Sequence, residues 1–362
     1  MAVAAVVLTR FDLALLILPT VLVALWLSRR NVKTIAIGAV AALAPLVIWF
    51  TWSQVTYSNW LPNTFEAKRN VNIPASELII QGLRYLMVSF ENDPVTLVGL
   101  IVGVGAGIAL GNAVIRAGAI GVLLYLAYVV WIGGDFMAGR FLTAPLVVAM
   151  LLLAAVPLFA RELSLVPAIG SVFFVGMMVL FAYLSGNTPV SLANPSSERW
   201  EVDQNLNAGV SDERGVYVAN GRDLKGLIDN LSLGFVEPPI GAFGDGTGLN
   251  RPLRELDQSA KLWPTSDGFF TLPSETHDMC GFLGTAGIVV GPTVHLVDAC
   301  ALTDRYLAQR EYTPAEPFAW KPGHFQRAIL EGYLEAIQSG DPTKVVDPAD
   351  RFALEQLWAN IR

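Results

Sequence analysis

The sequence predicts a polytopic α-helical membrane domain of about six spans over residues 1–186, followed by a soluble mixed α/β domain over residues 187–362. Three observations support this fold class. The chain is 53% hydrophobic and only 15% charged, which is too apolar for an ordinary soluble protein. Several long runs contain no charged residue at all. The net charge also changes from +3 in the first 185 residues to −10 in the rest, so the two halves are expected to meet different solvents.

The expected spans are runs without Asp, Glu, Lys or Arg. Each approaches the ~20 residues that an α-helix needs to cross the hydrocarbon layer. A sixth span is expected at residues 11–27, with Asp12 at its edge and Pro19 inside it, because membrane helices tolerate proline better than soluble helices do. The five uncharged runs are residues 35–52, 95–115, 117–134, 141–160 and 163–185.

Four glycines at a spacing of four residues mark one of these spans. Gly99, Gly103, Gly107 and Gly111 would share one face of a helix and let another helix approach closely. We expect this face to serve helix packing, within the chain or between chains, with no chemical role.

Basic residues fall on alternate connections between the expected spans, and the positive-inside rule places those connections in the cytoplasm. They are Arg29, Arg30 and Lys33, then Arg116, then Arg161. The other connections, at residues 57–94 and 133–140, and everything after about residue 187 then face outward. The expected location is the plasma (inner) membrane, with many spans and the C-terminal domain on the outer side. Met1 also falls outside, no signal peptide with a basic n-region is present, and the apolar stretch at residues 2–8 is cut short, so we expect the chain to be the remainder of a longer protein.

The C-terminal half has the composition of an outer domain. Its two cysteines, Cys280 and Cys300, are expected to form a structural disulfide in an oxidising compartment. The three histidines lack the short spacing of zinc sites, so no metal is expected. The acidic balance and the absence of basic runs interleaved with aromatic residues argue against nucleic acid as a partner.

Valine, isoleucine and aromatic residues bounded by Gly or Pro predict strands in this half, and helical apolar spacing predicts helices after them. Asp347 is a predicted cap and Pro348 a predicted first-turn residue of the last helix. The strands are expected at residues 215–220, 281–290 and 293–297, and the helices at 324–337 and 348–361.

The most informative polar residues lie on connections at the expected outer surface. Asp135 and Arg140 stand between two spans, at a depth where charge is costly, which favours a functional site. Gly133 and Gly134 allow a tight backbone there, and Arg140 offers a planar fork to a phosphate. The simpler alternative is a surface salt bridge between Asp135 and Arg140. For Lys68 or Arg10 taken singly, a site and an ordinary surface charge are equally good explanations.

Four segments resemble a known family of enzymes. They are LPNTFEAK at residues 61–68, GGDFMAGRF at 133–141, DACALTD at 298–304 and GHFQRAILEGYLEA at 323–336. Together, and in this order, they are similar to the terminal β-(1→2)-arabinofuranosyltransferases of mycobacterial and corynebacterial envelopes. Some relatives carry the label flagellar motor control protein ZomB. These enzymes belong to the GT-C superfamily of glycosyltransferases, and the resemblance covers the C-terminal portion of such proteins, so the membrane domain would be a partial GT-C fold.

The resemblance implies transfer of arabinofuranose from a polyprenyl-phosphate sugar lipid to a cell-wall glycan acceptor, with membrane lipids as further partners and no cofactor. Arg10, Lys68 and Arg140 are then the candidates for the donor phosphate, and Asn63 and Asp135 for sugar hydroxyls. GT-C enzymes carry their catalytic carboxylate in the first outer loop, which has no counterpart in this sequence. General-base catalysis contributes roughly 10²–10⁴-fold, so the chain alone is expected to be nearly inactive, with Asp135 as the weaker candidate for a substitute base.

Two other classes of function remain open. The first is a non-catalytic, membrane-anchored protein whose outer domain binds a glycan or a partner. The second is a transporter, which the uncharged central spans disfavour because transporters usually bury ionisable residues near mid-membrane.

Overall fold

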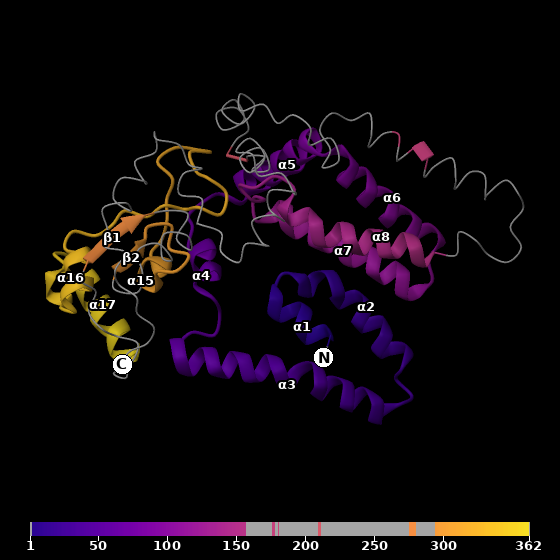
Figure 1. The fold of residues 1–362 in the computed structure, drawn as a ribbon, viewed down its shortest axis with the longest axis horizontal. Coiled ribbons are helices and arrows are strands. Elements are labelled where there is room, and N and C mark those ends of the chain that lie inside the picture. The colour runs from indigo at the N-terminus through magenta and orange to yellow at the C-terminus, as the bar shows by residue number, and fades with distance from the viewer. Residues whose placement is uncertain are drawn as a thin grey trace, which may run out of the picture. The chain divides into compact units, whose positions relative to one another are not determined.

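The computed structural model describes residues 2–156, 176–177, 180, 209–210, 275–279 and 294–361, and the described part is mostly helical (Figure 1). The chain divides into two compact units. Unit 1 comprises Met1–Phe50 and Pro74–Ala219, and unit 2 comprises Thr51–Ile73 and Asn220–Arg362. The expected domain boundary at residues 186/187 lies outside the described residues.

The described elements of unit 1 are helices joined by short turns. Asn112 caps α7, because its side-chain oxygen accepts hydrogen bonds from the amides of Val114 and Ile115. Asp93 caps α6 in the same way, with Pro94 in the first turn. The elements are α1 (Ala2–Thr9), α2 (Leu13–Leu27), α3 (Val32–Tyr57, which runs on into unit 2), α5 (Ala75–Asn92), α6 (Pro94–Leu110), α7 (Ala113–Trp131), the 3₁₀ turn η1 (Arg140–Leu142) and α8 (Thr143–Ala155).

Two described helices, α3 and α7, are long and apolar enough to cross a membrane. A third span is possible by length and composition if α5 and α6, which meet at a bend of 110°, are taken together. The apolar helices α2 and α8 are shorter. The structure therefore supports two to three candidate spans among the described residues. Most of the expected span at residues 163–185 lies outside them.

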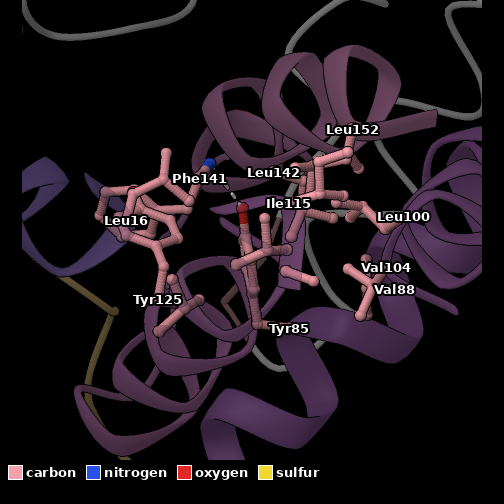
Figure 2. Close-up of a cluster of buried hydrophobic side chains, with 14 of the residues drawn as sticks. Leu16, Tyr85, Val88, Leu100, Val104, Ile115, Tyr125, Phe141, Leu142 and Leu152 are labelled. Atoms are coloured by element: carbon pink, nitrogen blue, oxygen red, sulfur yellow. Dashed lines mark hydrogen bonds between the residues drawn. The ribbon is translucent and has the colours of Figure 1, made fainter. Parts of the chain in front are cut away.

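Small residues determine how the helices of unit 1 pack. A Cβ atom added to Gly103 would lie 2.4 Å from the carbonyl oxygen of Ala149, so α6 and α8 are in close backbone contact. One added to Gly121 would lie 2.0 Å from the carbonyl oxygen of Leu16, which brings α2 equally close to α7. The expected packing role of the glycine face is confirmed as packing within the chain. Figure 2 shows the apolar cluster between these helices.

The helix directions place the connections at two opposite ends of unit 1. α2 runs antiparallel to α7, since Gly121 meets Leu16 and Gly118 meets Thr20. α6 and α8 also run antiparallel to α7. The connection at residues 28–31 and the α6–α7 turn therefore lie at one end, and Arg10 and the turn at residues 133–141 lie at the other.

Two expectations for the connections between spans are wrong in detail. The segment expected as an outer loop at residues 57–94 contains two helices, α4 (Asn63–Arg69) and α5. Glu77, Arg84 and Glu91 interrupt α5, so this helix contains no long uncharged run. Arg116, expected in a connection, lies inside α7, and its guanidinium donates to the carbonyl oxygen of Ile108 near the end of α6.

Unit 2 combines helices with a short parallel sheet. Strands β1 (Glu275–Met279) and β2 (Val294–Asp298) pair in parallel. The helical elements are α4, α15 (Arg305–Gln309), α16 (Tyr333–Ser339), η4 (Pro342–Lys344) and α17 (Pro348–Ile361). Ala67 of α4 is buried in the same apolar cluster as Val297, Leu307 and Leu354.

The last strand and the last helix of unit 2 confirm their predictions. The strand expected at residues 293–297 is β2, and the helix expected at 348–361 is α17. The carboxylate of Asp347 accepts from the amides of Ala349 and Asp350, as a cap does. The strands expected at 215–220 and 281–290 lie outside the described residues.

The helix expected at residues 324–337 is wrong for most of its length, because only α16 is helical. Gly332, in the left-handed region at φ +80°, begins the helix. Before it, the Arg327 side chain is buried and donates to backbone carbonyls, including that of Phe325 two residues earlier. The amide of Arg327 donates to Ala299 rather than to a residue four positions back. These contacts hold the segment in an irregular conformation.

Candidate functional site

The turn between α7 and α8 is built by glycines and by polar side chains of α5. Gly133, Gly134 and Gly139 all have positive φ angles, which glycine adopts without steric cost. The hydroxyl of Tyr85 accepts a 3.0 Å hydrogen bond from the amide of Phe141, drawn as a dashed line in Figure 2. Ser89 Oγ accepts one from the amide of Gly139 at 3.0 Å. The backbone of the turn is therefore fixed from two sides.

Asp135 and Arg140 form an ion pair on this turn. Asp135 is buried, with 1% exposure, and its Oδ1 accepts from the amide of Phe136. Its Oδ2 lies 3.2 Å from an Nη atom of Arg140, whose side chain is 53% exposed. The simpler alternative, a salt bridge, is thus present. It has one buried partner, so the carboxylate orients the guanidinium while most of that fork faces outward.

Arg10 lies close to the same turn. Its guanidinium binds both carboxylate oxygens of Asp12 and lies 2.9 Å from the hydroxyl of Tyr125. The Tyr125 hydroxyl in turn donates to Asp12 at 2.9 Å. Arg10 also stacks on the ring of Phe141, with its Cζ 4.8 Å from the ring centre. The Arg10 side chain keeps 35% exposure.

The charge of Arg10 is secured by its neighbours. Burial lowers its pKa, but the hydrogen bond to Asp12 and the charge of Asp12, with a smaller contribution from the charge of Asp135, outweigh burial, so the pKa is raised. Two partly exposed arginines thus lie next to Phe141, Arg10 by stacking on its ring and Arg140 as the preceding residue. Such a pair suits a phosphate or another small anion.

Sequence reasoning missed four residues of this site. Asp12 was noticed only as a charge at the edge of a span, and Tyr85, Ser89 and Tyr125 were not considered. A usable signal existed for Tyr125, because it places a hydroxyl inside an otherwise apolar run and buried tyrosine hydroxyls usually find a partner. Nothing in the sequence indicates that α5 contacts the turn.

The other two predicted binding residues, Asn63 and Lys68, belong to unit 2. Asn63 lies at the start of α4 and donates through Nδ2 to the carbonyl oxygen of Thr303 at 3.0 Å. Lys68 is exposed on the last turn of the same helix. The structure therefore groups Arg10, Asp135 and Arg140 in one unit, and Asn63 and Lys68 in the other.

Arginines attach the segment around α4 to the rest of unit 2. Arg327, only 4% exposed, donates to the carbonyls of Ala67 and Asn70 at the end of α4, and to those of Arg310 and Phe325. Arg305 donates to the carbonyls of Tyr57 and Ser58. As a result, three of the four segments that carry the family resemblance meet in unit 2, at residues 61–68, 298–304 and 323–336.

Two buried aspartates lie where these three segments meet. Asp298, with no exposed surface, accepts from the amides of Cys300 and Thr303. Asp304 accepts from the amide of Leu307, as the cap of α15, and from the hydroxyl of Tyr333. Burial, with a smaller contribution from the charge of Asp298, raises the pKa of Asp304 to about 6, although hydrogen bonds to its carboxylate oppose the rise. Both carboxylates are engaged in holding their own segments.

Cys300 is disulfide-bonded, and Cys280 lies outside the described residues, so the pairing of the two stays a prediction. Burial lowers the pKa of His295, which favours its neutral form. Among the described residues, no group of three or more His, Cys, Asp or Glu side chains is placed to hold a metal ion.

No protein-family model, curated protein or solved structure matches this chain. The candidate site is therefore defined by its own geometry. It consists of two partly exposed arginines, a buried carboxylate that orients one of them, and a glycine turn held by two side chains of α5.

Proposed function

We propose that this chain is a membrane glycosyltransferase of GT-C type that moves arabinofuranose from a polyprenyl-phosphate donor to a cell-wall arabinan. In this proposal the membrane domain crosses the plasma membrane about six times, and the C-terminal α/β domain lies on the outer side. The observation that carries the proposal is the exposed fork of Arg140, oriented by the buried Asp135 beside a second arginine, Arg10.

The site matches the chemistry of a lipid-linked sugar phosphate. Arginine presents two parallel donors to a phosphate, and a partly buried position strengthens each charge-assisted hydrogen bond. The arginines lie at one end of a bundle of apolar helices, where a polyprenyl chain could run beside α6 or α7 while its phosphate meets the arginines. Lys68 remains a candidate for the same phosphate, and Asn63 for a hydroxyl of the sugar.

The geometry favours a positioning role for Asp135. Its carboxylate is 1% exposed and is occupied by Arg140 and by the amide of Phe136. A general base must reach the proton that it removes, within about 2.6–3.2 Å of the acceptor hydroxyl. We therefore propose that Asp135 braces Arg140, and that the acceptor hydroxyl is deprotonated by another group.

The same observation supports a second candidate, a non-catalytic protein that binds a glycan or a polyprenyl-phosphate lipid. An anion site with a buried, engaged carboxylate can hold a phosphate without activating a nucleophile. The two candidates differ in turnover, so one assay separates them.

The test is transfer in lipid nanodiscs by the chain fused to an N-terminal GT-C half that supplies the first outer loop, since the chain alone is expected to be nearly inactive. Decaprenyl-phosphate-arabinose is the donor and an arabinan oligosaccharide the acceptor, and mass spectrometry of the acceptor detects the added pentose. Arg140→Lys keeps the charge but loses the fork, so transfer and donor affinity should fall about tenfold, the equivalent of one charge-assisted hydrogen bond of ~1.5 kcal/mol. Arg30→Lys is the matched control, because Arg30 is exposed at the opposite end of unit 1.

Equal donor affinity in Arg140→Lys and Arg30→Lys would remove Arg140 from the site. Binding of the donor by the fused chain without any added pentose on the acceptor would favour the non-catalytic candidate. Turnover that Asp135→Asn abolishes, with folding intact, would instead make Asp135 the base.

A further inference from the structure

Helix α5 carries its polar residues inward and its apolar residues outward. The buried face includes Glu77, Gln81, Ser89 and Asn92. Ile79, Ile80, Leu83, Met87 and Phe90 form a continuous stripe on the opposite face, with Leu83 55% and Met87 63% exposed. A helix on the surface of a water-soluble protein shows the reverse pattern. The surroundings of the outer face must therefore be apolar.

Charged residues border the apolar stripe along one of its two long sides. At 100° per residue, Glu91 and Arg84 follow the apolar stripe directly, and both residues are exposed. An apolar stripe bordered by charge is typical of a helix at the boundary between acyl chains and headgroups, where arginine can extend to the polar layer. A helix surrounded by hydrocarbon on all outer sides would not expose these charges.

The connection to α6 sets the direction of α5. The two helices meet at Asp93 with a bend of 110°, which Figure 1 shows as a sharp corner. α6 has no charged residue, and its 17 residues span about 25 Å, close to the thickness of the hydrocarbon layer. If α6 runs across the membrane, α5 runs nearer to the membrane plane than to the membrane normal.

We propose that α5 is an interfacial helix, whose stripe of Ile79, Ile80, Leu83, Met87 and Phe90 lies among the acyl chains just beneath the lipid headgroups. The occupant of this face is the bilayer itself, since the face continues at the corner into α6, an uncharged apolar helix of 17 residues. The inference rests on the membrane location proposed above. It adds that Tyr85 and Ser89, which hold the Arg140 turn, are anchored at the depth where lipid phosphates lie.

The test is the depth of environment-sensitive NBD labels on single added cysteines, in the oxidised full chain reconstituted in lipid vesicles. Leu83→Cys and Met87→Cys report on the stripe, Arg84→Cys on its charged edge, and Ile101→Cys on the exposed middle of α6. All four positions are exposed, so the labels remove no core contact. Chain-bound doxyl groups at a shallow and at a deep carbon serve as lipid quenchers, and iodide serves as the aqueous quencher.

We expect the labels at positions 83 and 87 to be quenched more by the shallow than by the deep doxyl group, because an interfacial helix sits ~5–10 Å into the headgroup boundary. The order should reverse at position 101, and iodide should quench position 84 most. Deep quenching at 83 equal to that at 101 would show α5 to be part of a span and overturn the proposal. Strong iodide quenching at 83, with 101 still deep, would also overturn it.

Two outcomes involve other occupants. A label at 83 that neither lipid nor iodide quenches would show that a protein covers the stripe, and self-quenching at full labelling would identify a second copy of the chain. Both overturn the proposal while leaving the spanning helix intact. Loss of lipid quenching at 101 as well would mean that the membrane location itself fails, which is a separate result.

Discussion

Arg140 in unit 1 and Arg327 in unit 2 use the same side chain in opposite ways. Arg140 makes one described ion pair, to the buried Asp135, and keeps half of its side chain exposed. Arg327 is 4% exposed and donates to four backbone carbonyls from separate segments. The first arrangement leaves donors available for a ligand. In the second arrangement the N–H groups of Arg327 bind backbone carbonyls of the protein. At the end of α4 these hydrogen bonds replace those that helix carbonyls otherwise make with caps or water.

The difference shows how a buried cation can serve structure through backbone carbonyls, with no direct ion pair among the described residues. Arg327 lies near Asp298, whose charge raises its pKa, but burial lowers that pKa more strongly. Carbonyl dipoles satisfy its N–H groups instead. Exposure and partner type therefore distinguish an arginine with donors available for a ligand from a structural one, which the sequence around each residue does not.

The sharpest test of this contrast replaces each arginine by lysine in a separate variant. Lysine keeps the charge but cannot donate from three separate nitrogen atoms. Arg327→Lys leaves several carbonyls unsatisfied and should lower the free energy of unfolding of unit 2 by about 3–5 kcal/mol. Urea unfolding of the full chain, followed by pulsed hydrogen exchange in α15 and α16, measures this loss.

Arg140→Lys should cost less than about 1 kcal/mol of stability in unit 1, because the exposed pair can re-form. Its effect should appear in donor affinity. A large loss of stability in Arg140→Lys, together with a small one in Arg327→Lys, would reverse the roles assigned to the two side chains.

A second prediction concerns the glycines of the Arg140 turn. Gly134 and Gly139 both have positive φ, but an added Cβ would meet the Tyr85 side chain at 2.4 Å only at Gly134. Gly139→Ala should therefore cost about 1 kcal/mol of backbone strain, and Gly134→Ala about 2–4 kcal/mol, because overpacking adds to that strain. The apparent melting temperature in detergent compares the two variants. Equal shifts would mean that Tyr85 does not brace the turn.

The smallest expected effect is the pH dependence of unit 2. The raised pKa of Asp304, about 6, exceeds its unfolded value of ~3.9, so the folded state holds a proton that the unfolded state releases between those values. The stability that this proton contributes is complete below about pH 4 and is lost as the pH rises through about 6. In the unchanged protein, the free energy of unfolding of unit 2 should therefore fall by about 2 kcal/mol between pH 4 and 7. Asp304→Asn keeps the oxygen that caps α15 and should remove this fall.

Asp341→Asn provides a control of opposite sign. Hydrogen bonds from Thr343 lower the pKa of Asp341 at the surface, so its contribution to stability is present above its unfolded pKa and is lost as the pH falls. Each variant is equilibrated in urea at each test pH, and hydrogen exchange is then carried out at one fixed pH. The experiment gives the change in free energy of unfolding with pH for both variants. An unchanged slope in Asp304→Asn would show that Asp304 does not titrate in this range.

Parts of the fold that depend on local patterns could be predicted from the sequence. The apolar run at residues 35–52 and the cap at Asp347 correspond to α3 and to the start of α17. The packing role of Gly103 followed from its spacing. Helix α5 escaped prediction because Glu77, Arg84 and Glu91 interrupt its apolar residues, so it contains no long uncharged run. The segment at 324–332 escaped because tertiary contacts of Arg327 override its helical spacing.

The candidate site was predictable only in part, because some of its contacts join segments that are far apart in the sequence. Asp135 and Arg140 are five residues apart, so their ion pair could be anticipated as the simpler alternative. The approach of Arg10 depends on the packing of α2 against α7, far along the chain, and no local pattern indicates it. Nor could the sequence separate Asn63 and Lys68 from the other candidates, since the division into units follows long-range contacts.

The close contact between Leu16 and Gly121 has a consequence for the order of assembly. Among the described helices, α2 packs chiefly on α7. A ribosome makes about a hundred further residues before that partner exists. During this interval Arg10 and Asp12 have each other but lack Tyr125 and Phe141. The arginine pair at the turn therefore forms late in biosynthesis. It is complete only when α7 and the turn after it have been synthesised and have packed against α2.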